Sequence, residues 1–174
     1  MRGLAPAVLA AALAASCGGG ASPPAPAPPA PAAALRLVPL APGPAPAPVA
    51  ATRVARVEVA STPEARERGL MNRASLAEDT GMLFAYPDER PRRFWMKNCR
   101  IALSAAFLDG NGRIVRVVEM EPGEGRPDAD IPLHESGAPA RYVLEMAAGW
   151  FRAAGIREGD LVDVVPALGG VVPR

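Results

Sequence analysis

The chain has 174 residues, of which 21 are proline and 17 are glycine, and its formal net charge is only +1. Residues 53–165 carry sixteen basic and all eighteen acidic side chains, so this segment is nearly neutral. The sequence shows no basic stripe with interleaved aromatic residues, which argues against nucleic-acid binding. A segment of about 110 residues can form one hydrophobic core without disulfides, and we expect one domain.

The first seventeen residues have the pattern of a bacterial export signal. Arg2 supplies a positive charge, and residues 4–15 are almost wholly apolar but shorter than the ~20 residues of a membrane-spanning helix. The run ends in Leu13-Ala14-Ala15-Ser16-Cys17, which resembles a lipobox, although Ala14 stands where a large apolar residue is usual. We therefore predict a lipoprotein of the cell envelope, anchored to the membrane through a lipid on Cys17. The alternative is ordinary signal cleavage, which would give a secreted or periplasmic protein.

Residues 18–52 consist almost entirely of Gly, Ala and Pro and predict a disordered tether. Pro-rich chain extends by ~3.1 Å per residue, so this tether could reach about 100 Å. Leu35-Arg36-Leu37-Val38 interrupts it. We interpret these four residues as a chance apolar island, with a weak docking peptide as the alternative.

The globular domain is expected to span residues 53–165. Alternating or continuous apolar patterns predict strands at 53–60, 81–86, 92–97, 104–109, 113–121, 142–146 and 161–165. Helices are predicted from Pro63 to Arg68, with Thr62 as N-cap and Gly69 as terminator, and over residues 147–154. Residues 166–174 are expected to form a flexible end. These elements indicate an all-β fold, a sandwich or barrel with one or two short helices.

The stretch Phe94-Trp95-Met96-Lys97-Asn98 is the most informative in the chain. Large apolar side chains begin both faces of this predicted strand, which suits a strand buried on both sides. Lys97 then has to extend to solvent or find a partner, because a buried charge without a partner is costly.

Two features favour ordinary loops over metal sites. Asp109-Gly110-Asn111-Gly112 resembles the start of a calcium loop, but no glutamate follows at the required spacing, so we predict a hairpin turn. His134 is the sole histidine and lies in a predicted loop, residues 122–140, without a cysteine cluster. We predict a solvated histidine, no metal and no cofactor.

Several motifs in order resemble the domain of unknown function 192 family over residues 53–165. They are Arg68-Gly69-Leu70-Met71-Asn72-Arg73, Gly81-Met82-Leu83-Phe84, Phe94 to Asn98, Tyr142-Val143-Leu144-Glu145, Gly149, Gly155 and Gly159-Asp160. The resemblance implies a compact, mostly β, jelly-roll-like domain that is often exported in bacteria. It implies no activity.

The chain departs from the family pattern at two positions. Ser104 stands where the family usually has an aspartate, which puts any site built on that aspartate in doubt. Cys99 stands where threonine is common, and we interpret it as a buried free thiol.

The leading hypothesis is a non-catalytic module that binds a small ligand, such as a sugar or a small anion. Aromatic stacking and a few polar groups would come from Arg68, Trp95, Lys97, Asn98 and Glu145. The bland alternative is that the aromatic and methionine side chains only pack the core. In that case Lys97 would pair with a carboxylate such as Glu145.

Two further hypotheses remain open. A structural domain that binds an envelope protein would expose a flat apolar patch, whereas a concave polar pocket beside Trp95 would favour a small ligand. A hydrolase would need a nucleophile with a base, a carboxylate pair or a metal, and only a Lys97–Glu145 pair is conceivable here.

Overall fold

The computed structural model describes residues 33–38 and 52–174, and the predicted signal peptide, Cys17 and most of the predicted tether lie outside them. The strands are β1 (Ala33–Val38), β2 (Arg53–Ala60), β3 (Thr80–Phe94), β4 (Leu103–Leu108), β5 (Ile114–Met120), β6 (His134–Ala147) and β7 (Leu161–Asp163). The helices are α1 (Pro63–Arg68), α2 (Trp150–Ala153), α3 (Val165–Leu168) and the 3-10 turn η1 (Asp128–Asp130). The predicted mostly β domain is confirmed.

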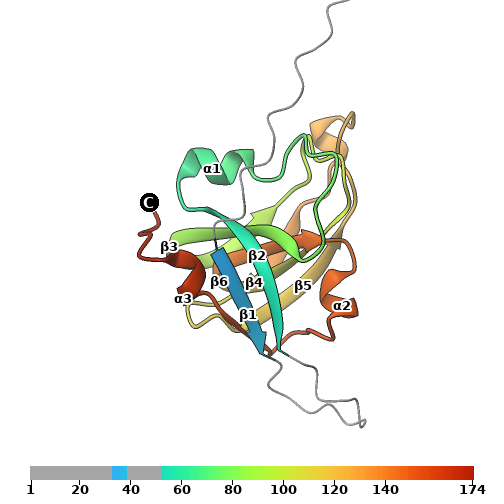
Figure 1. Cartoon of the computed structure of the whole chain (residues 1–174). Coiled ribbons are helices and arrows are strands. Elements are labelled where there is room, and N and C mark those ends of the chain that lie inside the picture. Colours follow the sequence, from blue (N-terminus) through green and yellow to red (C-terminus); the bar gives the residue numbers. More distant parts are fainter. Residues whose placement is uncertain (1–32, 39–51) are drawn as a thin grey trace, which may run out of the picture.

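The seven strands form one curled sheet in the order β5-β4-β6-β3-β2-β1-β7 (Figure 1). Its two edges meet, because Arg113 forms a β-bridge with Leu161 and the Ile114 N–H donates to the Asp160 carbonyl at 2.9 Å. The curl thus leaves one face of the sheet enclosed and the other facing outward.

Alternate residues of the same strands therefore enter two separate apolar clusters. The enclosed cluster contains Leu83 of β3 and Leu144 of β6, both without exposed surface. The outer cluster contains their neighbours Phe84 and Val143, together with residues that follow β3, such as Met96. Residues 81–85 of β3 are consequently buried on both faces, as the continuous apolar run there predicts.

The interpretation of Leu35–Val38 as a chance apolar island is wrong. This segment belongs to β1, which pairs antiparallel with β2 on one side and with β7 on the other. Figure 1 shows β1 beside β2. Leu35 and Leu37 have no exposed surface and enter the enclosed cluster, whereas Arg36 between them is exposed. The alternation of two leucines with polar or exposed neighbours is a strand signal that the surrounding Pro and Ala composition concealed.

Several other segment boundaries differ from the prediction. The strand predicted over 92–97 is the end of β3, which stops at Phe94, so Trp95 is 40% exposed rather than buried. β6 starts at His134, which makes the predicted 122–140 loop shorter and places His134 opposite Phe94 of β3. Pro166 lies within α3, where Ala167 is buried in the enclosed cluster, so residues 166–168 are not a frayed end.

Helix α1 matches its prediction. The Thr62 hydroxyl accepts a hydrogen bond from the Ala65 N–H at 3.3 Å, Pro63 occupies the first helical position, and Gly69 caps the C-terminus with φ of 47°. A Cβ atom at position 69 would lie only 3.2 Å from Cζ of the Phe84 ring. Gly69 therefore also allows the chain to pack closely against the sheet. Because β2 and β3 are parallel, the connection between them has to cross a sheet face, and α1 forms part of that crossover.

Candidate functional site

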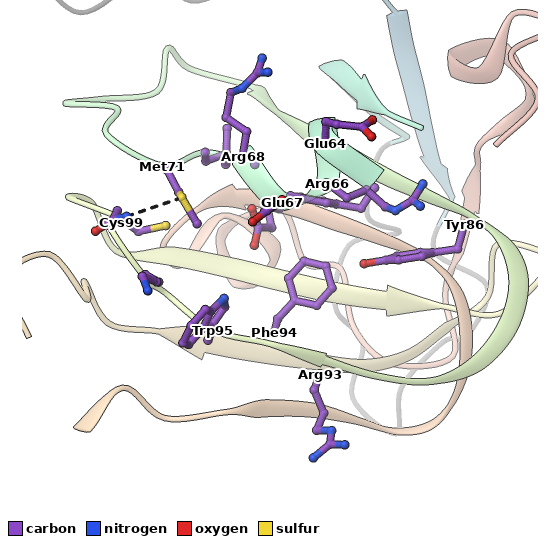
Figure 2. A pocket seen from close by; sticks show the side chains of 16 residues that line it. Glu64, Arg66, Glu67, Arg68, Met71, Tyr86, Arg93, Phe94, Trp95 and Cys99 are labelled. Atoms are coloured by element: carbon purple, nitrogen blue, oxygen red, sulfur yellow. Dashed lines mark hydrogen bonds between the residues drawn. The ribbon is translucent and has the colours of Figure 1, made fainter. Parts of the chain in front are cut away.

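A pocket of about 580 Å³ opens on the outer face of the sheet, beneath α1 (Figure 2). Its walls come from α1 and the residues that follow it, from β3, from the segment after β3, and from β6. The lining residues are Glu64, Arg66, Glu67, Arg68, Gly69, Leu70, Met71, Phe84, Tyr86, Arg93, Phe94, Trp95, Lys97, Asn98, Cys99 and Glu145.

All five residues predicted to bind a ligand line this pocket: Arg68, Trp95, Lys97, Asn98 and Glu145. They come from three parts of the sequence, which the β2–α1–β3 crossover and the β3–β6 pairing bring together. Their role in ligand binding stays a prediction. A concave pocket beside Trp95 is the feature expected of a small-ligand site, whereas a flat apolar patch was expected of a surface that binds a protein.

Glu145 lies on β6 between Met82 of β3 and Ala105 of β4, and only 4% of its surface is exposed. Within the described residues, its carboxyl group has no hydrogen bond and no ion pair. Burial raises the pKa of this carboxyl to about 8. The side chain is therefore mainly a neutral acid at neutral pH.

The prediction that Lys97 pairs with Glu145 is wrong. The Lys97 ammonium donates to Asp128 Oδ2 at 2.6 Å, and its Nζ lies 5.1 Å from the centre of the Trp95 ring. Asp128 belongs to η1, a turn in the predicted long loop, so no local pattern connected it with Lys97. The charge of Lys97 is thus neutralised at the rim of the pocket, and that of Glu145 is suppressed by burial.

The apolar wall of the pocket is built from aromatic rings in edge-to-face contact. The Phe84 and Phe94 ring centres lie 5.0 Å apart at 86°, and Phe94 meets Phe107 at 5.7 Å and 88°. Such contacts fix ring positions and stabilise beyond simple burial. Figure 2 shows the Phe94 ring between Trp95 and Tyr86, while the Arg93 side chain points away from them.

Tyr86 and Arg66 form a wall of the pocket that the sequence did not reveal. The Arg66 guanidinium lies 4.7 Å from the Tyr86 ring centre and donates to the carbonyls of Ser61, Ala85 and Arg174. The guanidinium of Arg92 also lies close to the Tyr86 ring, at 3.8 Å from its centre. Burial raises the pKa of the Tyr86 hydroxyl, and the two arginines oppose that shift. Arg66 therefore holds α1 in place and has few donors left for a ligand.

Cys99 is a buried free thiol, as predicted, and it also lines the pocket. Burial, with a smaller contribution from Glu145, raises the pKa of the thiol to about 12. A thiol with this pKa stays protonated and is a poor nucleophile near neutral pH. Next to it, Asn98 has a φ of 55° and its side-chain amide donates to Met71 Sδ at 3.9 Å.

Ser104 lies away from the pocket. On β4 its neighbours Leu103 and Ala105 join the outer cluster, so Ser104 faces the enclosed side. Its hydroxyl donates to Glu119 Oε2 at 2.7 Å and accepts from the Gly149 N–H at 2.8 Å. The serine found in place of the family aspartate therefore does not alter the pocket.

The predicted turn at Asp109 is confirmed, since Asp109 Oδ1 accepts from the N–H groups of Asn111 and Arg113. His134 is half-buried, and burial, followed by the charge of Arg116, lowers its pKa. In residues 33–38 and 52–174, no group of three or more His, Cys, Asp or Glu side chains is arranged to hold a metal ion. None of the helices in the same residues is long and apolar enough to cross a membrane.

The family model of DUF192, described as an uncharacterized ACR, matches residues 47–164. The chain belongs to the DUF192 family. The match covers the whole pocket, but β1 lies before it and α3 lies after it. The search of curated proteins found no match.

Two solved structures resemble this DUF192 chain. A protein from Sinorhizobium meliloti 1021, for which a role in regulating transcription has been suggested, is 31% identical with a TM-score of 0.64. The similarity covers 75% of this chain and 92% of that one. A protein of unknown function from Novosphingobium aromaticivorans DSM 12444 is 25% identical with a TM-score of 0.61, over 75% of this chain and 83% of that one.

Proposed function

We propose that this DUF192 protein is a non-catalytic module that binds a small neutral ligand, such as a sugar, in the pocket around Glu145. The observation that carries the proposal is the combination of an exposed indole, that of Trp95, with a buried and unpaired carboxyl at Glu145 in one concave site. An aromatic surface with a few polar groups in an otherwise apolar cavity is typical of small-molecule sites.

A neutral ligand suits the rim better than a small anion does. Lys97 is already paired with Asp128, and the Arg66 guanidinium already donates hydrogen bonds to backbone carbonyls. The remaining charged groups on α1 have both signs, since Glu64 and Glu67 lie on the same helix as Arg68. No strong positive field is therefore directed into the pocket.

A hydrolase is less well supported. The Lys97–Glu145 pair that could have served as base and acid does not form within the described residues. Cys99, the nucleophilic side chain nearest in sequence to Lys97, has a pKa of about 12 and therefore stays protonated near neutral pH.

A thermal-shift screen of the full chain against neutral mono- and oligosaccharides tests the binding function. A ligand at 100 times its dissociation constant should stabilise the fold by about 2.7 kcal/mol. Trp95→Ala should abolish the shift, whereas Leu133→Ala, which removes a 57% exposed side chain outside the pocket, should not. A shift that persists in Trp95→Ala, or no shift with any sugar, would contradict the proposal.

We also propose that the protein is exported and anchored in the cell envelope through a lipid on Cys17. This rests on the charged start, the apolar run and the lipobox-like sequence that ends in Cys17. Metabolic labelling with a fatty acid should mark the wild-type protein and not Cys17→Ala, and the variant should leave the membrane fraction. Cys99→Ala, which removes the other cysteine, is the control and should remain labelled.

A further inference from the structure

The buried carboxyl of Glu145 is an exception among the buried polar side chains of the described residues. Arg92 donates to the Ala140 carbonyl and to Asp88, Ser104 bonds to Glu119, and Ser136 donates to the Ala138 carbonyl. Within the described residues, Glu145 has neither a hydrogen-bond partner nor an opposite charge, and its side chain lines the pocket. A polar group that no protein atom satisfies has to be met from the pocket, by water or by a ligand.

The groups around Glu145 do not explain its burial. They are Glu64, Arg66, Glu67 and Arg68 on α1, Tyr86 and Arg93 on β3, and Lys97 and Cys99 after β3. Arg66 and Lys97 bond elsewhere, Arg93 points away (Figure 2), and Cys99 stays protonated. A neutral carboxylic acid in this setting presents one O–H donor and one carbonyl acceptor on the same edge.

We propose that Glu145 acts as the specificity-determining residue of the pocket, in its neutral form. Its O–H donates to the ligand and its carbonyl accepts from the ligand, so the pocket selects a neutral hydroxyl or amide group. A ligand that carries an ammonium or a carboxylate at this point is rejected. The inference rests on the proposed binding function and deepens it.

This selection follows because the O–H and the carbonyl of the acid pair with an acceptor and a donor on the ligand. A hydroxyl or an amide can satisfy both atoms of the acid, and the apolar rings of Phe84 and Phe94 line the same pocket. A ligand carboxylate would satisfy only the donor of the acid, and two of the cations that line the pocket, Arg66 and Lys97, already bond to other groups. A ligand ammonium would require Glu145 to ionise in surroundings that disfavour its charge.

The test uses four sugars that share one ring: glucose, N-acetylglucosamine, glucosamine and glucuronate. Binding is followed by fluorine NMR of the full chain labelled with fluorotryptophan. Trp95 reports on the pocket, and Trp150, whose indole N–H donates to Asp79 at 2.8 Å, is the internal control. At about pH 6 only the two uncharged sugars should shift the Trp95 signal, because glucosamine is then a cation and glucuronate an anion.

Two variants and a pH series separate the outcomes. Affinity of the wild type for the neutral sugars should fall about tenfold from about pH 7 to about pH 9, as Glu145 ionises. Glu145→Gln, which keeps a neutral donor and acceptor, should bind at both pH values without this loss. Glu145→Leu, which removes both, should lose binding.

The contrary results are equally distinct. Preference for glucosamine, or tighter binding at alkaline pH with loss in Glu145→Gln, would make Glu145 a counter-ion and overturn the inference. Neutral-sugar binding that all Glu145 variants retain would overturn it too, while leaving the binding function intact. If none of the four sugars moves the Trp95 signal, both this inference and the proposed sugar binding fail.

Discussion

The two faces of the sheet, built from the same strands, have opposite character. On β6, Leu144 and Met146 enter the enclosed cluster, whereas Val143 and Glu145 turn to the outer face. On the enclosed side the buried Ser104 has both a donor and an acceptor partner. On the outer side an acid is buried without any partner in the described residues.

The contrast between the two faces shows where the fold tolerates a destabilising side chain. The enclosed cluster follows the ordinary rules of a core, with apolar side chains and satisfied polar groups. The outer face departs from these rules at Glu145, whose buried carboxyl lines the pocket beneath α1 without a protein partner in the described residues. Violations of this kind concentrate at functional sites, since elsewhere they only reduce stability.

The largest effect is expected from removing the contribution of β1 to the enclosed face. The double variant Leu35→Ala/Leu37→Ala should lose on the order of 5 kcal/mol of unfolding free energy, because two fully buried leucines leave cavities. Urea denaturation measures this loss. Val38→Ala, at a 39% exposed position on the same strand, should change stability by less than about 0.5 kcal/mol. Equal stability of the double variant and the wild type would mean that β1 is not part of the fold.

Glu145 on the outer face should make the free energy of unfolding depend on pH. The pKa of Glu145 is about 8 in the folded chain and near its ordinary value of 4.5 in the unfolded chain. The folded state therefore holds more protons between these values, and stability should fall as pH rises from 4.5 to 8, then level off. The contribution is at most about 1.4 kcal/mol per pH unit.

Glu145→Gln provides the matched control, because it cannot ionise and should lack this component of the pH dependence. Glu145→Leu should be more stable than wild type by ~1–3 kcal/mol at neutral pH, since it removes an unmet polar group. Identical pH profiles of wild type and Glu145→Gln in urea denaturation would show that Glu145 is not buried as a neutral acid.

A smaller effect is expected at the helix that covers the pocket. Thr62→Ala removes the side-chain cap of α1 and should cost about 1 kcal/mol. Ser61→Ala is the control, because α1 uses only the backbone carbonyl of Ser61, which accepts from Arg66. Thermal unfolding of the two variants measures the difference, and a larger loss in Ser61→Ala would contradict the assigned cap.

The smallest effect is expected at the rim. Asp128→Asn removes the partner of Lys97, but the Asp128 side chain is 57% exposed and Lys97 is 35% exposed, so solvent screens the pair. The loss in unfolding free energy should be below about 1 kcal/mol and should vanish at high salt. A loss of several kcal/mol in denaturation at low salt would mean that the rim is part of the core.

The sequence predicted the elements with strong local signals. β2 and α1 were expected over the residues that form them, because an alternating run and a Thr-Pro cap define their ends. The turn at Asp109 was equally local. The end of β3 was not predicted, since Phe94 and Trp95 are both large and aromatic and no local feature tells which one is buried.

The site was predicted as a set of residues but not as a set of contacts. Motif residues identified Arg68, Trp95, Lys97, Asn98 and Glu145, and folding brings all five to one pocket. The pairing of Lys97 with Asp128 and the packing of Arg66 on Tyr86 depend on the crossover and on η1. Contacts between distant segments of this kind have no periodic signal in the sequence.

The position of β1 also decides how far the domain could stand from a bilayer. Ala33 pairs with Val57, near the end of β2 from which α1 starts, so the chain enters the sheet at the end where the pocket opens. Only the fifteen residues 18–32 separate Cys17 from β1, and fifteen residues of any sequence can span at most about 54 Å. A lipid on Cys17 would thus keep the mouth of the pocket close to the lipid headgroups of the membrane. Molecules displayed on that surface, rather than those in open solution, would be the first to meet it.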